Sequence, residues 1–487
     1  MSTLLSLLVL LPALLSGIFL VDLAWRDTSG AGRVCKFFLG CGLGLGASTC
    51  LGYFSLLAFG ARRLASFWLD LAALAVLLIL WLRAWRRGEV QPLLISFSFN
   101  RRILLPLLAL GLSAAAALLI FLSFTMLNPN GDFDAWTMWN LRARFLFRAG
   151  ADWQTAFSDQ MHWMFHADYP LLLPLLTLKA WSALGLDTPR APILIAALFL
   201  FCSVGLLTAY LARVGWLRAA LAGMLLLAAP RYLDLAAFQV ADVPLSFFIL
   251  AGILLGVESG RAHTHRSNLL ALAGLAFGLA AWTKNDGILS LLAAALVGAG
   301  LLLRQLLDKT RNLRRSAESP LYAHAGQVDA AGQTISRAAA ALLGGAPPFF
   351  TLLVFKLFLA PPGDMLAGQT LAGAVQKLGD FSRYALITRA LLENLWQLGE
   401  YPLPIVPCLL VFAWSAGRRK LAAGETNSLA WAGLTLAVTL LGYGAVYLLT
   451  PHPLDWHLQY SADRLLLQLY PAALCLLFVV FLEKETL

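Results

Sequence analysis

Charged residues are scarce in this chain. Only 13% of its 487 residues are Asp, Glu, Lys or Arg, while 60% are hydrophobic. Soluble domains contain about 25% charged and about 45–50% apolar residues. This composition excludes a soluble globular enzyme and a disordered chain. Because about 20 apolar residues cross the hydrocarbon core of a bilayer as a helix, the sequence predicts an all-α polytopic membrane protein.

Cysteine is also rare, and its placement excludes a disulfide-stapled secreted module. The six cysteines lie within apolar runs and show no metal-binding spacing, so we interpret them as small hydrophobic residues. They are Cys35, Cys41, Cys50, Cys202, Cys408 and Cys475.

Three other features narrow the class of protein. The net charge of +10 does not indicate a nucleic-acid partner, because the basic residues lie in short loops where they set membrane topology. No Gly-rich phosphate loop of the Walker type is present, so ATP is not implied. The first 24 residues are apolar without a preceding basic region, which favours a first span over a cleaved signal peptide.

Thirteen apolar segments are predicted to span the membrane. A further stretch, 171–186, contains Pro174 and Lys179 and is short for a span, so it is predicted to lie at the interface or to re-enter. The predicted spans are 2–24, 35–60, 67–84, 103–126, 190–212, 216–232, 243–257, 268–283, 287–304, 338–360, 402–416, 427–450 and 464–482.

Charge distribution orients these spans. If 171–186 does not cross and the N-terminus is outside, most Lys and Arg residues fall on one side, including the cluster Arg418–Lys420. Positive charge favours the cytoplasmic side, so this arrangement is the better one. The inner loop 305–337 is polar and is predicted to be a flexible connector. The outer side then receives the loops 127–189, 231–242, 283–287, 361–401 and 451–463.

An acidic turn follows the fourth predicted span. Asp132 and Asp134 lie in Asn-Pro-Asn-Gly-Asp-Phe-Asp-Ala-Trp, and Trp136–Arg148 is predicted to form an amphipathic helix with Arg142 on a polar position. A carboxylate near low-dielectric surroundings is a plausible general base. In the alternative interpretation, Asp132 caps the helix and Asp134 pairs with an arginine.

Two more outer segments carry candidate residues. His166 and Tyr169 lie in His-Ala-Asp-Tyr-Pro, where His166 could donate to a phosphate or an acceptor group, or the segment could be an interfacial belt. His162 and His166 have i,i+4 spacing, but without a third ligand a zinc site is weakly supported. Asp242 stands where the seventh predicted span begins, as an N-cap or as a functional charge.

Cations of the outer loops complete the candidate set. Lys284 lies in the turn Trp-Thr-Lys-Asn-Asp-Gly, and His457 and Arg464 precede the last predicted span. Each of these cations could contact a lipid phosphate. Alternatively, Lys284 snorkels to the headgroups, and Arg464 pairs with Asp463 or Asp455.

The order of these motifs resembles the membrane glycosyltransferases of the GT-C fold, in particular the protein O-mannosyltransferases and the bacterial aminoarabinose transferase of lipid A. The resemblance covers residues 103–482, including the loop 127–189, and is preceded by extra helices in 1–102 and followed by a short cytoplasmic tail, 483–487. The family's first loop often has an Asp-Glu pair, whereas here Asp134 is followed by Ala135.

The resemblance implies an inverting glycosyltransferase at the periplasmic face of a bacterial inner membrane. Its donor would be a polyprenyl-phosphate-linked sugar, and its acceptor a glycan, lipid or protein. Membrane lipids, and no nucleic acid, would be its other partners. The alternatives are a transporter or flippase for a lipid-linked substrate, and an oligosaccharide ligase or polymerase.

The resemblance also suggests a role for each candidate residue. Asp134 would be the base, with Asp132 as the alternative, and Asp242 would orient the acceptor or assist a divalent cation. The remaining candidates form two groups. The donor phosphate would be held by Lys284, His457 and Arg464, and the cleft would be lined by His166, Tyr169 and Trp136.

Overall fold

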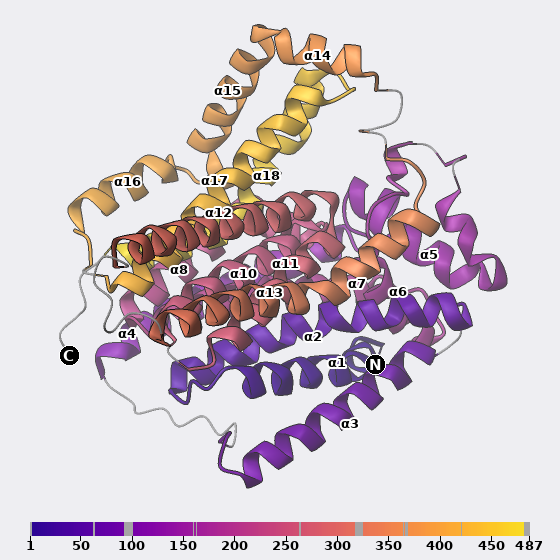
Figure 1. The fold of residues 1–487 in the computed structure, drawn as a ribbon. Helices are drawn as coiled ribbons and strands as arrows, with labels where there is room; N and C mark the ends of the chain where they lie inside the picture. Colours follow the sequence, from indigo (N-terminus) through magenta and orange to yellow (C-terminus); the bar gives the residue numbers. More distant parts are fainter. Residues whose placement is uncertain are drawn as a thin grey trace.

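The computed structural model describes residues 2–61, 64–91, 101–158, 160–161, 163–262, 264–316, 325–363, 365, 369–419 and 421–481. Within these ranges every regular element is a helix (Figure 1). Ten helices are long and apolar enough to cross a membrane. They are α1 (Ser2–Ala24), α2 (Gly30–Phe59), α3 (Ala65–Arg86), α4 (Arg101–Leu127), α7 (Arg190–Ala212), α10 (Asp242–Arg261), α12 (Asn285–Ser316), α13 (Ala325–Phe358), α17 (Ala423–Leu449) and α18 (Leu454–Val480).

Two bent helix pairs could add one span each. The helices α8 (Trp216–Leu227) and α9 (Pro230–Ala237) meet at 63°, and the segment Phe381–Glu400 meets α16 (Ile405–Ser415) at 85°. Proline at the start of α9 and before α16 explains these breaks, since proline cannot continue a helix. The all-α polytopic fold is confirmed, with up to twelve spans by length and composition. The count of thirteen stays a prediction, because α11 (Arg266–Thr283), at the predicted span 268–283, is not among the ten.

The stretch 171–186 forms a short buried helix. Helix α6 (Leu172–Leu184) has 13 residues, a length of about 20 Å against the ~30 Å of a bilayer core. It ends at Gly185, whose φ of +68° suits glycine. Helix α6 packs against α1, α2 and α7. It is therefore too short to cross by itself, as the sequence predicts.

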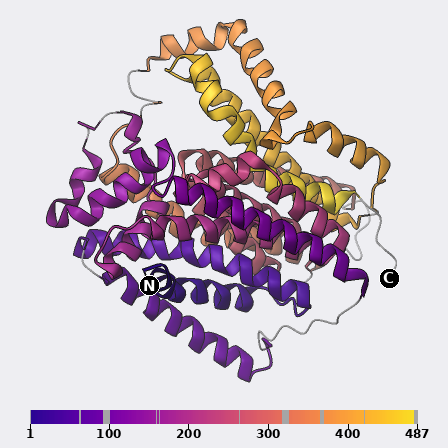
Figure 2. The same ribbon diagram turned by 180° about the vertical axis from the view of Figure 1, so that it is seen from behind.

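Helix α10 forms the centre of the bundle. It is the most buried of the ten candidate spans, and it packs against α7, α11, α17 and α18. In both views α1, α2 and α3 lie along one side, and α14 (Leu371–Gly379) and α15 (Phe381–Trp396) project on the other (Figures 1 and 2). Most of α3 faces outward, as expected for a helix that contacts lipid.

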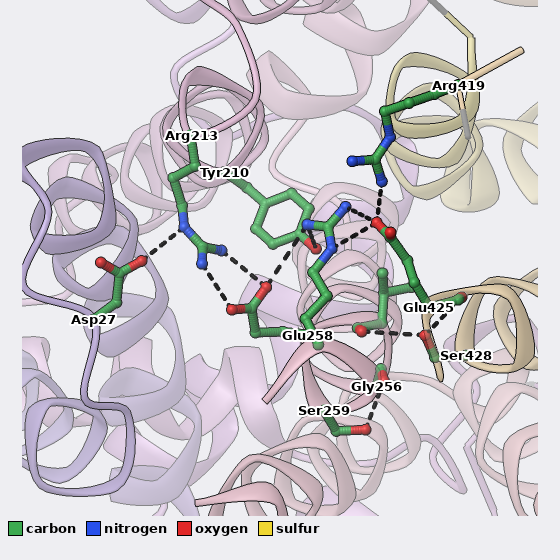
Figure 3. A network of polar contacts seen from close by, with 11 residues as sticks. Asp27, Tyr210, Arg213, Gly256, Glu258, Ser259, Arg419, Glu425 and Ser428 are labelled. Atoms are coloured by element: carbon green, nitrogen blue, oxygen red, sulfur yellow. Dashed lines mark hydrogen bonds and ion pairs between the residues drawn. The ribbon is translucent and has the colours of Figure 1, made fainter. Parts of the chain in front are cut away.

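A network of ion pairs connects loops that are predicted from the sequence to lie on the cytoplasmic side (Figure 3). Arg213 pairs with Asp27 and Glu258, both at 2.7 Å. Glu425 pairs with Arg419 and with Arg261, the latter at 2.5 Å. We call this group the inner network. It joins the loops after α1 and α7, the end of α10 and the segment before α17. Lys420, predicted on the same side, lies outside the described residues.

Three local predictions are wrong. The segment 305–337 is not a connector throughout, because α12 continues to Ser316 and α13 begins at Ala325. The last helix begins at Leu454, directly after Pro453, and not at Arg464. The loop 361–401 contains α14 and α15, whose polar positions make them look like loop in a hydropathy pattern. The cysteine prediction is confirmed: all six are free, and Cys408 alone is exposed.

Candidate functional site

The acidic turn after α4 is docked against the segment that precedes α10. Gly131 has φ +77°, and a Cβ on it would lie 2.5 Å from the Phe238 carbonyl oxygen, so only glycine fits there. The amide of Asp132 donates to the same carbonyl at 3.3 Å. The chain then enters a π-helical turn, η1 (Ala135–Trp139), which continues as α5 (Asn140–Arg148). Such turns are frequent at functional sites.

Gln239 holds this turn from the opposite side. Its amide donates to the Pro129 carbonyl oxygen at 3.1 Å, and its Oε1 accepts from Asn140 at 2.9 Å. Gln239 has φ +59°, a conformation that costs a non-glycine residue about 1–3 kcal/mol and that tends to occur at functional sites. The two contacts fix the position of Asp134 relative to the start of α10.

Asp242 is the first residue of α10 and is only 1% exposed. Arg464 Nη2 donates to its Oδ2 at 2.6 Å, while Gln468 Nε2 at 2.6 Å and Lys284 Nζ at 3.1 Å reach its Oδ1. The side chain is therefore not free to act as an N-cap. Three donors stabilise a buried carboxylate that would otherwise be costly.

Two further carboxylates complete the group. Arg464 Nη1 lies 2.5 Å from Asp134 Oδ2, and Lys284 Nζ lies 2.8 Å from Asp286 Oδ2. We call Asp134, Asp242, Lys284, Asp286 and Arg464 the acid–base cluster. In it, two cations each bridge two carboxylates, and the central carboxylate of Asp242 is shared by both cations.

Surrounding polar groups tune the cluster. Gln468 Nε2 also contacts Asp286 Oδ2 at 3.2 Å, and Tyr443 OH donates to Gln468 Oε1 at 2.8 Å. Burial disfavours the charged form of Lys284 and lowers its pKa. The nearby carboxylates of Asp242 and Asp286 have a larger, opposite effect, so the pKa of Lys284 is raised overall. Lys284 is therefore a fixed cation at neutral pH.

Four of the nine predicted site residues meet in the acid–base cluster: Asp134, Asp242, Lys284 and Arg464. Asp134 does pair with an arginine, as the alternative interpretation holds, and its partner is Arg464. The alternative interpretation of Arg464, a pair with Asp463 or Asp455, is wrong: Arg464 pairs with Asp134 and Asp242, and Asp463 binds Arg231 at 2.7 Å. In a helix that already begins at Leu454, residues 463 and 464 point in different directions.

The other predicted residues lie around the cluster. Asp132 is exposed beside Asp134. His457 Nδ1 lies 2.9 Å from Thr450 Oγ1, two turns before Arg464 on α18. His166 has φ +43° and stacks on Tyr169 at 4.6 Å between ring centroids. The exposed Trp136 packs on Phe133.

Arg142 is buried and not on a polar surface, which corrects the predicted amphipathic pattern. It is 4% exposed and donates to the carbonyl oxygens of Phe165, His166 and Tyr169 at 2.9, 2.6 and 3.0 Å. Burial lowers the pKa of Arg142 to about 10, although Asp168 opposes the shift. The reason for its position is that the irregular segment 163–170 leaves carbonyl groups that need donors.

Several polar residues of the site are absent from the sequence-based set. Asp286 belongs to the cluster, and Gln468 donates to two of the cluster's carboxylates. Asp168 contacts Asn285 and Lys356 in a second group beside the cluster. Lys356 was detectable as a lone charge in an apolar span. Asp168 and Asp286 stand within motifs already singled out, but only their contacts reveal their importance.

Within the described part of the chain, no metal-binding group lies at the cluster, and an apolar cavity lies away from it. Among the described residues, no group of three or more His, Cys, Asp or Glu side chains could hold a metal ion. His162, of the weak zinc hypothesis, lies outside the described residues. An apolar cavity of about 490 Å³ lies at the other end of the bundle, between α2, α4, α7 and α8. This cavity is therefore separate from the acid–base cluster.

Comparison with known families supports the resemblance. Residues 193–338 match the family described as dolichyl-phosphate-mannose-protein mannosyltransferase. The matched stretch contains Asp242, Lys284 and Asp286, whereas Asp134 and Arg464 lie outside it. No curated protein and no solved structure matches the chain. The chain thus resembles the protein O-mannosyltransferases, a GT-C family of membrane glycosyltransferases that use a polyprenyl-phosphate-linked sugar.

Proposed function

We propose that this chain, a multi-pass membrane protein resembling the GT-C glycosyltransferases, transfers a sugar from a polyprenyl phosphate to an acceptor at the periplasmic face of a bacterial inner membrane. The observation that carries the proposal is the acid–base cluster. Asp134, a carboxylate from the first outer loop, pairs with Arg464, and Arg464 and Lys284 share the carboxylate of Asp242 at the outer ends of buried helices. A base beside a pair of phosphate ligands is what this reaction requires.

The proposed reaction is an inverting displacement. The acceptor hydroxyl oxygen attacks the anomeric carbon, its proton passes to Asp134, and the bond from that carbon to the phosphate oxygen breaks. The polyprenyl phosphate leaves with the bonding electron pair. Lys284 and Arg464 stabilise the negative charge that develops on the leaving phosphate.

Asp242 has a supporting role in this scheme. It is buried beneath Arg464, Gln468 and Lys284, so we assign it to holding the two cations and not to orienting the acceptor. A divalent cation stays a candidate for helping to neutralise the phosphate, because the three carboxylates of the cluster outnumber its two cations. Transfer measured in the presence of EDTA tests this point.

The ion pair between Arg464 and Asp134 suggests how donor binding prepares the base. Arg464 uses Nη1 for Asp134 and Nη2 for Asp242. A donor phosphate that binds Nη1 would displace Asp134, because both compete for the same N–H groups. The released carboxylate would then be available to the acceptor. His457 lies farther out on α18, and we assign it to the path by which the donor headgroup approaches.

The acceptor would approach from the first outer loop. This loop contains several short helices between Ala135 and Leu184. Trp136 is exposed beside Asp134, and the stacked rings of His166 and Tyr169 lie farther along the same loop. Aromatic faces of this kind suit a sugar or a side chain with an apolar face. We propose that these three residues line the acceptor cleft.

A transporter or flippase remains the alternative function because charged residues also occur inside the N-terminal helices. Lys179 binds Asp70 and Ser48, and Lys36 binds Asp22. Intramembrane charges often mark transport pathways. Here each lysine is buried against its own carboxylate, so these pairs are better suited to attaching α1–α3 and α6 to one another.

One experiment separates the two functions. The purified chain in lipid vesicles is given synthetic polyprenyl-phosphate sugars, and both release of polyprenyl phosphate and movement of the labelled lipid across the bilayer are measured. We expect release in the presence of acceptor extract without lipid movement. Lipid movement without release would instead establish the transporter. Mass spectrometry of surface glycans and lipids from a deletion strain would identify the acceptor.

A further inference from the structure

Asp168 joins four segments at the outer end of the bundle. Its Oδ2 accepts from Asn285 Nδ2 at 2.8 Å and from Lys356 Nζ at 3.2 Å, and Lys356 also donates to its carbonyl oxygen at 2.6 Å. A Cβ on Gly363 would lie 2.9 Å from the same Oδ2, so only glycine fits there without displacing the carboxylate. Asp168 is 5% exposed. The first outer loop, α12, α13 and the segment after α13 therefore meet at one carboxylate.

This junction adjoins the acid–base cluster through one residue. Asn285 stands between Lys284 and Asp286, which both belong to the cluster. The backbone of this turn is tight, since the Gly287 amide donates to the Lys284 carbonyl oxygen at 2.9 Å. Asp168 therefore binds the turn through Asn285, while the side chains on either side of Asn285, Lys284 and Asp286, belong to the cluster.

The same loop is tied to the candidate base. Arg142 binds the backbone on both sides of Asp168, through the carbonyl oxygens of His166 and Tyr169. Arg142 lies on α5, which continues from the π-helical turn that begins immediately after Asp134. On one side, the chain from Asp134 leads to Arg142, which binds the segment around Asp168, and Asp168 binds Asn285. On the other side, Lys284, next to Asn285, pairs with Asp242, and Arg464 connects Asp242 to Asp134. The result is a closed ring.

We propose that Asp168 is a positioning residue that sets where Lys284 lies relative to Asp134. It acts through Asn285 and does not itself touch the donor or the acceptor. The inference rests on the proposed function, since it concerns the geometry of phosphate and base. A catalytic group displaced by about 1 Å can lose about 10²-fold in rate, so a small change at this junction should affect transfer.

Exchange of the two interacting groups tests the inference. In the Asp168→Asn variant the carboxylate is lost, and in the Asn285→Asp variant two carboxylates face each other and repel. The double variant Asp168→Asn/Asn285→Asp again places an amide opposite a carboxylate. We expect each single variant to raise the donor KM and to lower transfer by about 10-fold or more. We expect the double variant to regain most of the lost transfer.

The matched control is Asp187→Asn. Asp187 lies in the same outer loop and pairs with Arg148 at 2.5 Å, away from the turn 283–287. Its loss should leave the donor KM unchanged. Thermal unfolding of every variant is measured alongside, because a merely structural role would lower the unfolding temperature and the amount of folded protein but leave the donor KM of the folded protein unchanged.

The outcomes are distinct. If the wild type releases no polyprenyl phosphate, the proposed function fails, and the inference fails with it. If the wild type is active but the single variants match it, the positioning role alone is refuted. The same conclusion follows if the double variant is no better than the poorer single variant.

Discussion

Arg464 shows how a single residue can link two functions. Its guanidinium contacts Asp134 in the first outer loop and Asp242 at the start of the central helix. A planar guanidinium can serve two acceptors at once, which an ammonium cannot do with the same geometry. In the proposed reaction this places the phosphate ligand and the base within one hydrogen-bonded unit.

Replacing the candidate base, Asp134, should lower turnover without weakening donor binding. In Asp134→Asn the size is kept but the proton acceptor is lost, so turnover should fall by about 10²-fold or more. Donor affinity should hold or improve, because Arg464 loses a competing carboxylate. Single-turnover assays and titration with a polyprenyl-phosphate analogue measure the two quantities. The matched control is the exposed Asp132→Asn. A nearly normal Asp134→Asn together with an inactive Asp132→Asn would transfer the role to Asp132.

Replacing the phosphate ligand should affect binding first. In Arg464→Lys the bidentate contact is lost, and donor binding should weaken by roughly 1–3 kcal/mol, the range for a charge-assisted hydrogen bond. Titration of the purified protein with a polyprenyl-phosphate analogue gives the difference. Arg389→Lys, at an exposed pair on α15, is the matched control. Equal affinity in the wild type and in Arg464→Lys would remove Arg464 from the donor site.

At the scale of elements, α10 is held by charges at both of its ends. Its first residue, Asp242, lies in the acid–base cluster, and Glu258 near its last turn lies in the inner network. The helix between them is almost fully buried. Asp242 and Glu258 are 16 residues apart on this helix, which separates the two groups by about 24 Å at a rise of about 1.5 Å per residue. The inner network can therefore be disturbed without direct contact with the proposed chemistry.

Glu258→Gln should lower stability but not the chemical step. Glu258 is 6% exposed and pairs with Arg213, and removing one partner of a buried pair costs about 3–5 kcal/mol. We expect a lower temperature of unfolding, with turnover per folded molecule unchanged at low temperature. Glu393→Gln, which breaks an exposed pair on α15, should change the unfolding temperature little. A folded but inactive Glu258→Gln would show that the inner network takes part in catalysis.

At the scale of the whole molecule, polar contacts are divided between the two ends of the bundle. The inner network joins the loops predicted on one side of the membrane, and the acid–base cluster with the Asp168 junction joins those predicted on the other. Each end is thus closed by its own ion pairs. The positive-inside rule predicts that the inner network faces the cytoplasm.

Labelling from outside the cell tests this orientation. In a Cys408→Ser background, which removes the exposed native thiol, cysteine is placed at Thr155 in the first outer loop or at Arg418 beside the inner network. A membrane-impermeant maleimide should modify the cysteine at 155 and spare the one at 418. Permeabilised cells, in which both should react, provide the control. The reverse pattern would overturn the periplasmic location.

Local residues were enough to predict part of this site. Asp134, Asp242, Lys284 and Arg464 were singled out because each is a charge at the outer end of an apolar segment, where a charge is costly. The contacts between these residues could not be predicted. Arg464 and Asp242 are 222 residues apart, and Gln468 is an ordinary polar residue until the fold places it beside Asp242.

Patterns along the chain were enough to predict the membrane class, the positions of most spans and the shortness of the apolar helix within 171–186. These depend on the length and apolarity of continuous segments, and those are local quantities. Tertiary structure alone decided that Arg142 is buried, that Asp168 joins four segments and that Arg464 bridges Asp134 to Asp242. The physical reason is that a charge becomes stable inside a bundle only with partners from other helices. Those partners are chosen by how the helices pack and not by any pattern along the chain.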